Sequence, residues 1–188
     1  ELALSDHRSS QITLDELLRV ASDAYTAGLM SAKAGLVHLH MGDGERQFEL
    51  IEKALETAEL PARIYHPTHV NRNKPLFEAS KSLSQRGVTV DVTAFPEADG
   101  GFMAAEAIDN WLKSDLNPSR ITCSSDGGGC LPVFDADGEM IRMGVGQSDV
   151  LGETFKDLLS LGHSIDRISA IFSTNVARVL RMPKKGRI

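Results

Sequence analysis

Apolar runs and amphipathic stretches alternate along the chain. Runs that are apolar, β-branched or alternating predict strands at residues 1–4, 36–40, 62–65, 88–93 and 121–125. Apolar positions at helical spacing predict helices at residues 13–28, 48–58, 75–87, 103–112, 149–161 and 164–180. Strand and helix therefore alternate with short connections, which predicts an α/β fold with a parallel sheet and right-handed crossovers.

Local signals support several of these boundaries. Thr13 followed by Glu16 has the spacing of a capping box, Pro75 suits a first helical turn, and Gly87 suits a helix end. Residues 127–146 predict a long loop, in which Asp137-Gly138 indicates a small hairpin.

Polar side chains gather where three of the predicted strands end, at residues 38–43, 66–73 and 122–129. Parallel strands of this number fit either a doubly wound sheet or part of an eight-stranded barrel. An open sheet concentrates its ligand at one switch point, whereas a barrel presents site residues at successive strand ends. The pattern therefore favours the C-terminal part of a (β/α)8 barrel.

The composition narrows the class of protein. A chain of 188 residues with 41% hydrophobic content can bury one core without disulfides. The formal charge of −6, with no basic block and 5% aromatic residues, argues against a nucleic-acid or membrane surface. No apolar run is long enough to span a bilayer, and the first residues lack the features of a signal peptide. We therefore expect Cys123 and Cys130 to be reduced thiols in a cytoplasmic protein.

Three strand-end residues have the side chains of a zinc site. His40, His69 and Asp126 offer imidazole nitrogen and carboxylate oxygen, which zinc takes as ligands. A carboxylate at such a site can also accept the proton of the attacking water and deliver it to a leaving amine, which makes Asp126 a candidate catalytic residue. His38 and His66, in contrast, are expected to be core side chains with satisfied hydrogen bonds.

Two arginines lie in polar segments that follow predicted strands, Arg8 after the first and Arg72 after the third. A pair of guanidinium groups over one site would bind substrate carboxylates through bidentate contacts. The alternatives are ordinary surface arginines and, at residues 66–73, a polar loop without chemistry.

Four motifs carry a resemblance to a known family. They are, in chain order, Ser5-Asp6-His7-Arg8-Ser9, His40-Met41-Gly42-Asp43, Pro67-Thr68-His69-Val70-Asn71-Arg72-Asn73 and Ser124-Ser125-Asp126-Gly127. In this order and at these spacings, the chain resembles the isoaspartyl dipeptidases of the amidohydrolase superfamily over nearly its whole length. The run that begins at Pro67 is the most specific, because amidohydrolases in general share only the scattered His and Asp.

The resemblance implies a distorted (β/α)8 barrel that holds two zinc ions. These would activate a bridging hydroxide that attacks the β-aspartyl peptide bond of a dipeptide. By position, His40 and His69 would ligate one zinc ion, and Asp126 would ligate the other and carry the proton. Arg8 and Arg72 would bind the substrate carboxylates.

Two further positions follow from the resemblance. Glu1 falls where many family members have a carboxylated lysine that bridges both metals, and a glutamate can also bridge because it has two oxygens. Cys130 stands where the family has a serine near the substrate, and a thiol is the weaker hydrogen-bond donor.

The resemblance covers strands four to eight of such a barrel. His38-Leu39-His40 has the spelling of the His-x-His pair on the superfamily's first strand, but the Met41-Gly42-Asp43 that follows places it on the fifth. We therefore expect residues 1–188 to form a partial barrel, with the N-terminal strands and the small β domain outside this chain. Residues 185–188 would begin the return to that domain.

Two other functions are compatible with the sequence. Another amidohydrolase, acting on a cyclic amide or an N-acyl amino acid, would share the His and Asp ligands without needing both arginines. A non-catalytic barrel scaffold would bind no metal. The resemblance also implies a homo-oligomer, for which Phe155 and Leu158 are candidate contact residues.

Overall fold

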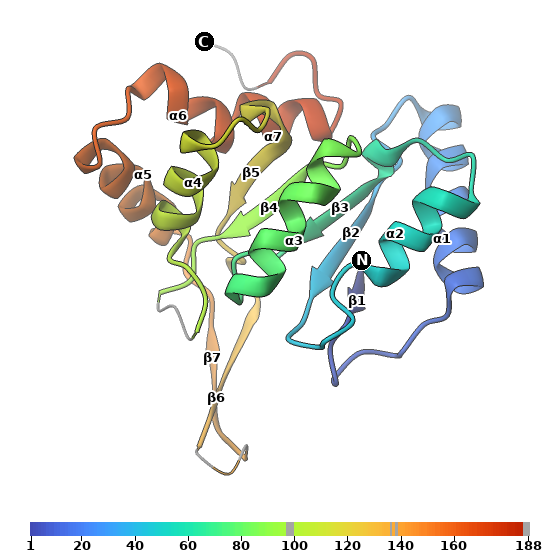
Figure 1. The fold of residues 1–188 in the computed structure, drawn as a ribbon, viewed down its shortest axis with the longest axis horizontal. Coiled ribbons are helices and arrows are strands. Elements are labelled where there is room, and N and C mark those ends of the chain that lie inside the picture. Colours follow the sequence, from blue (N-terminus) through green and yellow to red (C-terminus); the bar gives the residue numbers. More distant parts are fainter. Residues whose placement is uncertain (97–99, 136, 138, 186–188) are drawn as a thin grey trace.

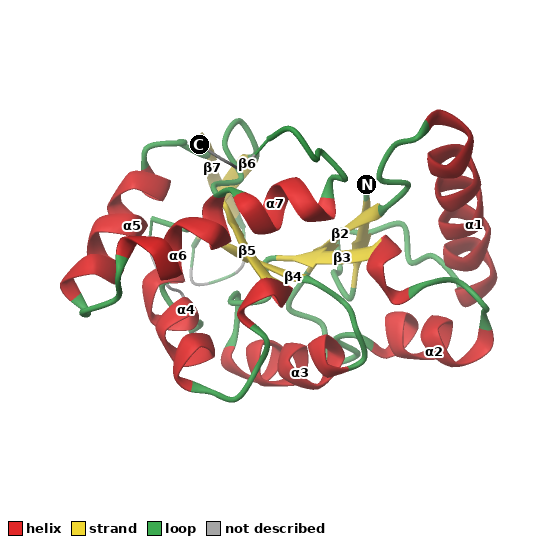
Figure 2. Ribbon diagram, turned by 90° about the horizontal axis from the view of Figure 1, so that it is seen from above, coloured by secondary structure: helices red, strands yellow, loops and turns green. Residues whose placement is uncertain are grey.

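The computed structural model describes residues 1–96, 100–135, 137 and 139–185 of the chain. Short strands lie at the centre and helices lie outside them (Figure 2). The central strands are β1 (Leu2–Leu4), β2 (Val37–Met41), β3 (Tyr65–Thr68), β4 (Val90–Thr93) and β5 (Ile121–Ser124). The helices are α1 (Leu14–Ser31), α2 (Glu49–Thr57), α3 (Lys74–Gln85), α4 (Ala104–Lys113), α5 (Val150–Ser160), α6 (Ile165–Phe172) and α7 (Thr174–Val179). An antiparallel hairpin of β6 (Cys130–Phe134) and β7 (Met140–Val145) follows β5.

The central strands pair in chain order. Strands β1, β2 and β3 form one parallel sheet, and β4 and β5 form a second. Between the two sheets, the backbone N–H of Val70 donates to the carbonyl of Asp91 at 3.2 Å, so β4 continues beside β3. The predicted α/β fold with parallel strands is confirmed.

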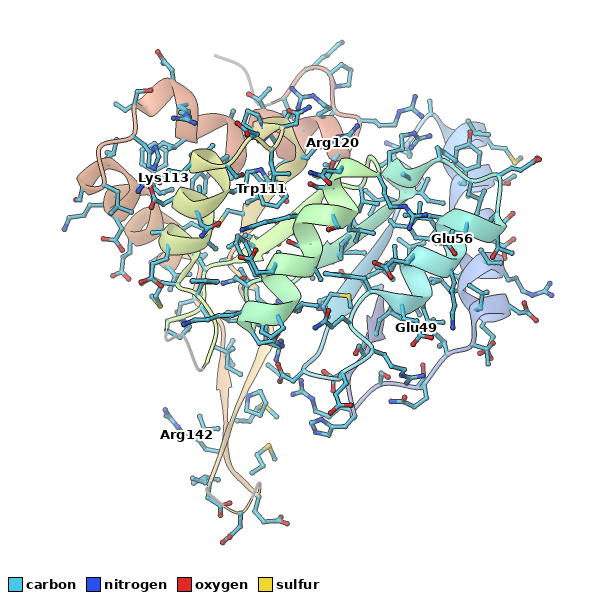
Figure 3. All side chains as sticks on the ribbon, viewed as in Figure 1. Glu49, Glu56, Trp111, Lys113, Arg120 and Arg142 are labelled. Atoms are coloured by element: carbon cyan, nitrogen blue, oxygen red, sulfur yellow. The ribbon has the colours of Figure 1, made fainter. Side chains whose placement is uncertain are left out.

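Side chains of β2 alternate between two environments. Val37, Leu39 and Met41 are buried in the hydrophobic core that also takes in helices α1 and α2. His38 and His40 lie on the opposite face of the strand and are half-buried. The face of the strands that points away from the helices, called the inner face below, is therefore polar. The hydrophobic core lies between the strands and the helices, and Trp111 of α4 is fully buried in it (Figure 3).

Two helix predictions need correction. Helix α1 has the predicted capping box of Thr13 and Glu16 but continues past Gly28 to Ser31. Gly28 does not end the helix but lets its backbone pack closely against Gly35, since a Cβ on Gly28 would lie 2.4 Å from the Cα of Gly35. The helix predicted at residues 164–180 breaks at Ser173 into α6 and α7.

The third strand begins later than predicted. Residues Ala62–Ile64 form a 3-10 turn, and β3 runs from Tyr65 to Thr68 with all four residues buried. The prediction at residues 62–65 was based on apolar residues. The strand itself carries the polar side chains of His66 and Thr68, which form hydrogen bonds in the interior.

The segment predicted as a long loop contains the hairpin of β6 and β7, which projects from the body at the end toward which the strand arrows point (Figure 1). Its predicted Asp-Gly turn involves Gly138, which lies outside the described residues, as do positions 186–188 of the predicted return segment. Of the proposed contact residues, Leu158 was wrong because it is fully buried. Phe155 is half-buried and packs edge-on against Phe172, and its role as a contact residue stays a prediction. No helix within the described ranges is long and apolar enough to cross a membrane.

Candidate active site

A cavity of about 1050 Å³ is lined by the loops that follow the central strands and by the hairpin. Segments after β1, β2, β3 and β5 contribute its polar wall. The hairpin, with Phe95 and Phe102, contributes apolar surface. The polar strand-end segments singled out in the sequence thus face one cavity.

The polar wall holds a cluster of two imidazoles and one carboxylate. Ligand atoms of His40, His69 and Asp126 all lie within 4.8 Å of one another. The imidazoles are in direct contact, with 2.9 Å between Nδ1 of His40 and Nε2 of His69. His69 follows β3 directly and Asp126 lies two residues after the end of β5, and their φ angles are 63° and 51°. Such left-handed backbone is unfavourable for residues with side chains and is typical of functional sites.

Two glycines of the hairpin base enclose Asp126. A Cβ on Gly146 would lie 2.3 Å from the backbone oxygen of Asp126, and one on Gly129 would lie 2.7 Å from its Oδ1. The two glycines are joined by a 2.9 Å hydrogen bond from the N–H of Gly146 to the carbonyl of Gly129. Glycine at these two positions therefore allows the base of the hairpin to pack directly against the turn that carries Asp126.

His69 is held as a neutral imidazole. Burial, reinforced by the nearby Arg72 guanidinium, lowers the pKa of His69 to about 3. Its Nδ1 lies 2.8 Å from the hydroxyl of Thr93 on β4, which leaves Nε2 facing His40. An imidazole must be neutral to ligate a metal ion, so His69 is in the state that ligation requires.

The cluster fits a divalent metal ion. Metal–nitrogen bonds of about 2.0–2.1 Å, as zinc forms, separate two ligands of a tetrahedral site by roughly 3.3 Å. The imidazole nitrogens, 2.9 Å apart, therefore need to separate by only a few tenths of an ångström. The carboxylate of Asp126 lies close enough to add a further metal ligand beside the two imidazoles. These residues could hold a metal ion.

The two predicted arginines line the same cavity but are held differently. Arg8 forms a bidentate pair with Asp6, with hydrogen bonds of 3.0 and 2.8 Å from Nε and Nη2. This pair lowers the pKa of Asp6 to about 2. Arg72 lies over the ring of Phe95 at 5.6 Å, and its buried Nε has no hydrogen-bond partner among the described residues. Its Nη1 lies 3.9 Å from Oδ2 of Asp43, so Nε is the donor that remains for a ligand.

The remaining predicted site residues lie at the edges of the cluster. Glu1 is exposed, with Oε2 3.6 Å from Nε2 of His40. Cys130 is the first residue of β6 and lines the cavity. Both Cys130 and Cys123 are free thiols, and burial raises the pKa of Cys123. Every predicted site residue is therefore at or beside the cavity.

His38 and His66 have partners for their ring nitrogens, as expected, although only His66 is buried and His38 is half-buried on the polar face of β2. Their Nδ1 atoms lie 2.9 Å apart, and Nε2 of His66 lies 3.3 Å from the hydroxyl of Thr122. Burial lowers the pKa of both imidazoles, that of His66 to about 4.

Sequence reasoning missed three contributors to the site. Asp6 orients Arg8, Thr93 contacts His69, and Arg142 of β7 lines the cavity from the hairpin (Figure 3). Asp6 stands inside a recognised motif and could have been found there. Thr93 and Arg142 carried no local signal, because their roles arise from contacts between distant segments.

Comparison with known proteins was made for the whole chain. No family model matches it. A beta-aspartyl dipeptidase from thermophilic keratin-degrading Fervidobacterium islandicum AW-1, in complex with β-Asp-Leu dipeptide, is similar with a TM-score of 0.92 and 38% identity. That match covers 100% of this chain and 49% of the other. A second beta-aspartyl dipeptidase structure from this organism has a TM-score of 0.86 and 36% identity, over 100% of this chain and 47% of that one. The chain spans about half the length of these proteins.

Proposed function

Because the chain resembles β-aspartyl dipeptidases of known structure over its whole length, we propose that it is part of a zinc-dependent peptidase that hydrolyses the β-aspartyl peptide bond of dipeptides. The observation that carries this proposal is a single cavity that contains both a His–His–Asp cluster and two arginines. The cluster supplies the chemistry of amide hydrolysis, and the arginines supply recognition of a substrate with two carboxylates.

A β-aspartyl dipeptide carries an α-carboxylate on its aspartyl residue and a second carboxylate at its C-terminus. Arg72 binds one of them through its Nε, which has no hydrogen-bond partner within the described residues. Arg8 binds the other while Asp6 holds its guanidinium from behind. Cys130 makes the polar contact for which a serine would be the stronger donor.

Asp126 is the proton carrier. Its carboxylate accepts a proton from the attacking water and then donates it to the amine that leaves. His40 and His69 would hold one metal ion and Asp126 a second, and Glu1, whose Oε2 lies 3.6 Å from Nε2 of His40, would be the ligand that the two ions share. Bound zinc supplies Lewis acidity toward the amide carbonyl and lowers the pKa of water. The glycines around Asp126 keep its carboxylate close to both imidazoles.

We further propose that β1 to β5 are strands four to eight of a (β/α)8 barrel. Support comes from their pairing in chain order, from the polar inner face and from the cavity at one end. A homo-oligomer in the cytoplasm completes the proposal, and the two free cysteines are consistent with a reducing compartment.

Metal removal tests this proposal. The complete protein is assayed for leucine release from β-Asp-Leu before chelation, after chelation and after zinc is added back. We expect activity to disappear and return, with two zinc ions per chain. Zinc binding without cleavage, but with turnover of a cyclic amide or an N-acyl amino acid, would favour a different amidohydrolase. A protein that binds no metal would be a scaffold.

A further inference from the structure

A buried carboxylate on β4 takes no part in the chemistry proposed above. Asp91 is 2% exposed and is not among the residues that line the cavity. Three hydroxyl groups donate to it, from Thr68 at 2.7 Å and from Thr122 and Ser124 at 2.5 Å each. A carboxylate offers only acceptors, so each of these hydroxyls must donate its single proton to Asp91.

One branch of this network leads to the metal cluster. Because the proton of Thr68 is directed to Asp91, the Thr68 oxygen accepts from Thr93, whose hydroxyl lies 3.4 Å away. The hydroxyl of Thr93 then accepts from Nδ1 of His69 at 2.8 Å. A Thr93 hydroxyl that donates to Thr68 has only oxygen lone pairs left for His69, which puts a proton on Nδ1 of His69 and a lone pair on Nε2. Nε2 is the atom that faces His40.

The second branch obeys the same rule. The proton of Thr122 is directed to Asp91, so its oxygen accepts from Nε2 of His66 at 3.3 Å. Nδ1 of His66 is then an acceptor for Nδ1–H of His38 at 2.9 Å. Both branches end on the same carboxylate, which accepts from the first hydroxyl of each.

We propose that Asp91 is a positioning residue that fixes the Nδ1–H tautomer of His69, acting through Thr68 and Thr93, so that Nε2 is free to ligate the metal ion. Asp91 contacts neither substrate nor metal. A carboxylate commonly orients a metal-ligating histidine directly. Here the carboxylate orients the histidine indirectly, through the hydroxyls of Thr68 on β3 and Thr93 on β4. The inference rests on the proposed function insofar as His69 ligates a metal ion.

Two variants break the relay at different points. Asp91→Leu removes the final acceptor, and Thr68→Val removes the middle link with almost no change in shape. In either variant Thr93 can turn its proton toward His69, which permits the Nε2–H tautomer. Thr122→Val is the matched control, because it removes another hydroxyl bonded to Asp91 on the branch that leads away from His69.

The first measurement is nitrogen NMR of the His69 ring in the metal-free complete protein. We expect the Nδ1–H form in the wild type and in Thr122→Val, and a shift toward Nε2–H in Asp91→Leu and Thr68→Val. The second is zinc affinity, which should fall about 10- to 100-fold in the two relay variants and change less than twofold in the control. If Asp91→Leu fails to fold, the tautomer and zinc affinity of Thr68→Val alone test the proposal.

An Nε2–H tautomer in the wild type would overturn the proposal. So would Thr68→Val with an unchanged tautomer and unchanged zinc affinity. Failure of the wild type to cleave β-Asp-Leu would refute the proposed function instead, while the tautomer in the metal-free protein would still decide the role of Asp91.

Discussion

Replacing Gly129 by alanine should impair the site while leaving the fold intact. The added Cβ would lie 2.7 Å from Oδ1, 2.8 Å from Cγ and 2.9 Å from the backbone oxygen of Asp126. The carboxylate must retreat by roughly 0.7 Å or more to reach ordinary van der Waals contact. Misplacing a catalytic group by about 1 Å can cost 10²-fold in rate, so we expect kcat for β-Asp-Leu to fall about 10- to 100-fold. The carboxylate can rotate away, but the backbone oxygen can move only with its turn, so the loss of stability should be about 1–3 kcal/mol.

Two controls separate this effect from a general disturbance. Gly152→Ala places a methyl group in helix α5, where nothing lies within 4 Å of the added Cβ, and should leave kcat unchanged and raise stability by about 0.5–1 kcal/mol. In an Asp126→Ala background, Gly129→Ala should add no further loss, because its effect passes through that carboxylate. Normal kcat in Gly129→Ala, or full additivity in the double variant, would refute the assignment of Asp126 as the proton carrier.

Three further predictions follow from the cavity and the interior. Arg72→Gln should raise KM for the dipeptide about 10- to 150-fold, the equivalent of losing a charged hydrogen bond of about 1.5–3 kcal/mol; an unchanged KM would exclude carboxylate binding by Arg72. Cys130→Ser should lower KM about 2- to 10-fold, because a hydroxyl is the stronger donor, and no change would mean that the thiol makes no substrate contact. Burial lowers the pKa of His66 from its usual 6.5 to about 4, so the unfolded chain binds more protons than the folded one between these values. The free energy of unfolding should therefore fall as pH drops through that window, by up to about 1.4 kcal/mol per pH unit from this residue. Urea titrations of His66→Gln should show a shallower slope than the wild type, and equal slopes would contradict this.

Elements with strong local signals could be predicted from the sequence. The capping box at Thr13 and the β-branched run at residues 88–93 agree with a helix and a strand of the structure. The break at Ser173 could not be predicted, because it accompanies hydrogen bonds from the buried Asn175 side chain to the carbonyls of Pro118 and Ile121. Apolar periodicity continues through that break and carries no trace of such distant contacts.

The candidate site likewise has residues that the sequence could predict and residues that it could not. His40, His69 and Asp126 could be found because each stands in a motif at a strand end. The hydroxyl relay from His69 to Asp91 could not, because it depends on strand register and on which face each threonine occupies. Motifs identify groups that do chemistry, whereas the groups that orient them become visible only when the strands are side by side.

The most direct test of the central claim is a competition between two linkages. The complete protein, loaded with zinc, is given equal amounts of β-Asp-Leu and α-Asp-Leu, and loss of each dipeptide is followed over time. We predict that the β-linked dipeptide is hydrolysed and that the α-linked one remains. Equal consumption of both dipeptides, or of neither, would contradict the proposal that this cavity recognises the β-aspartyl bond.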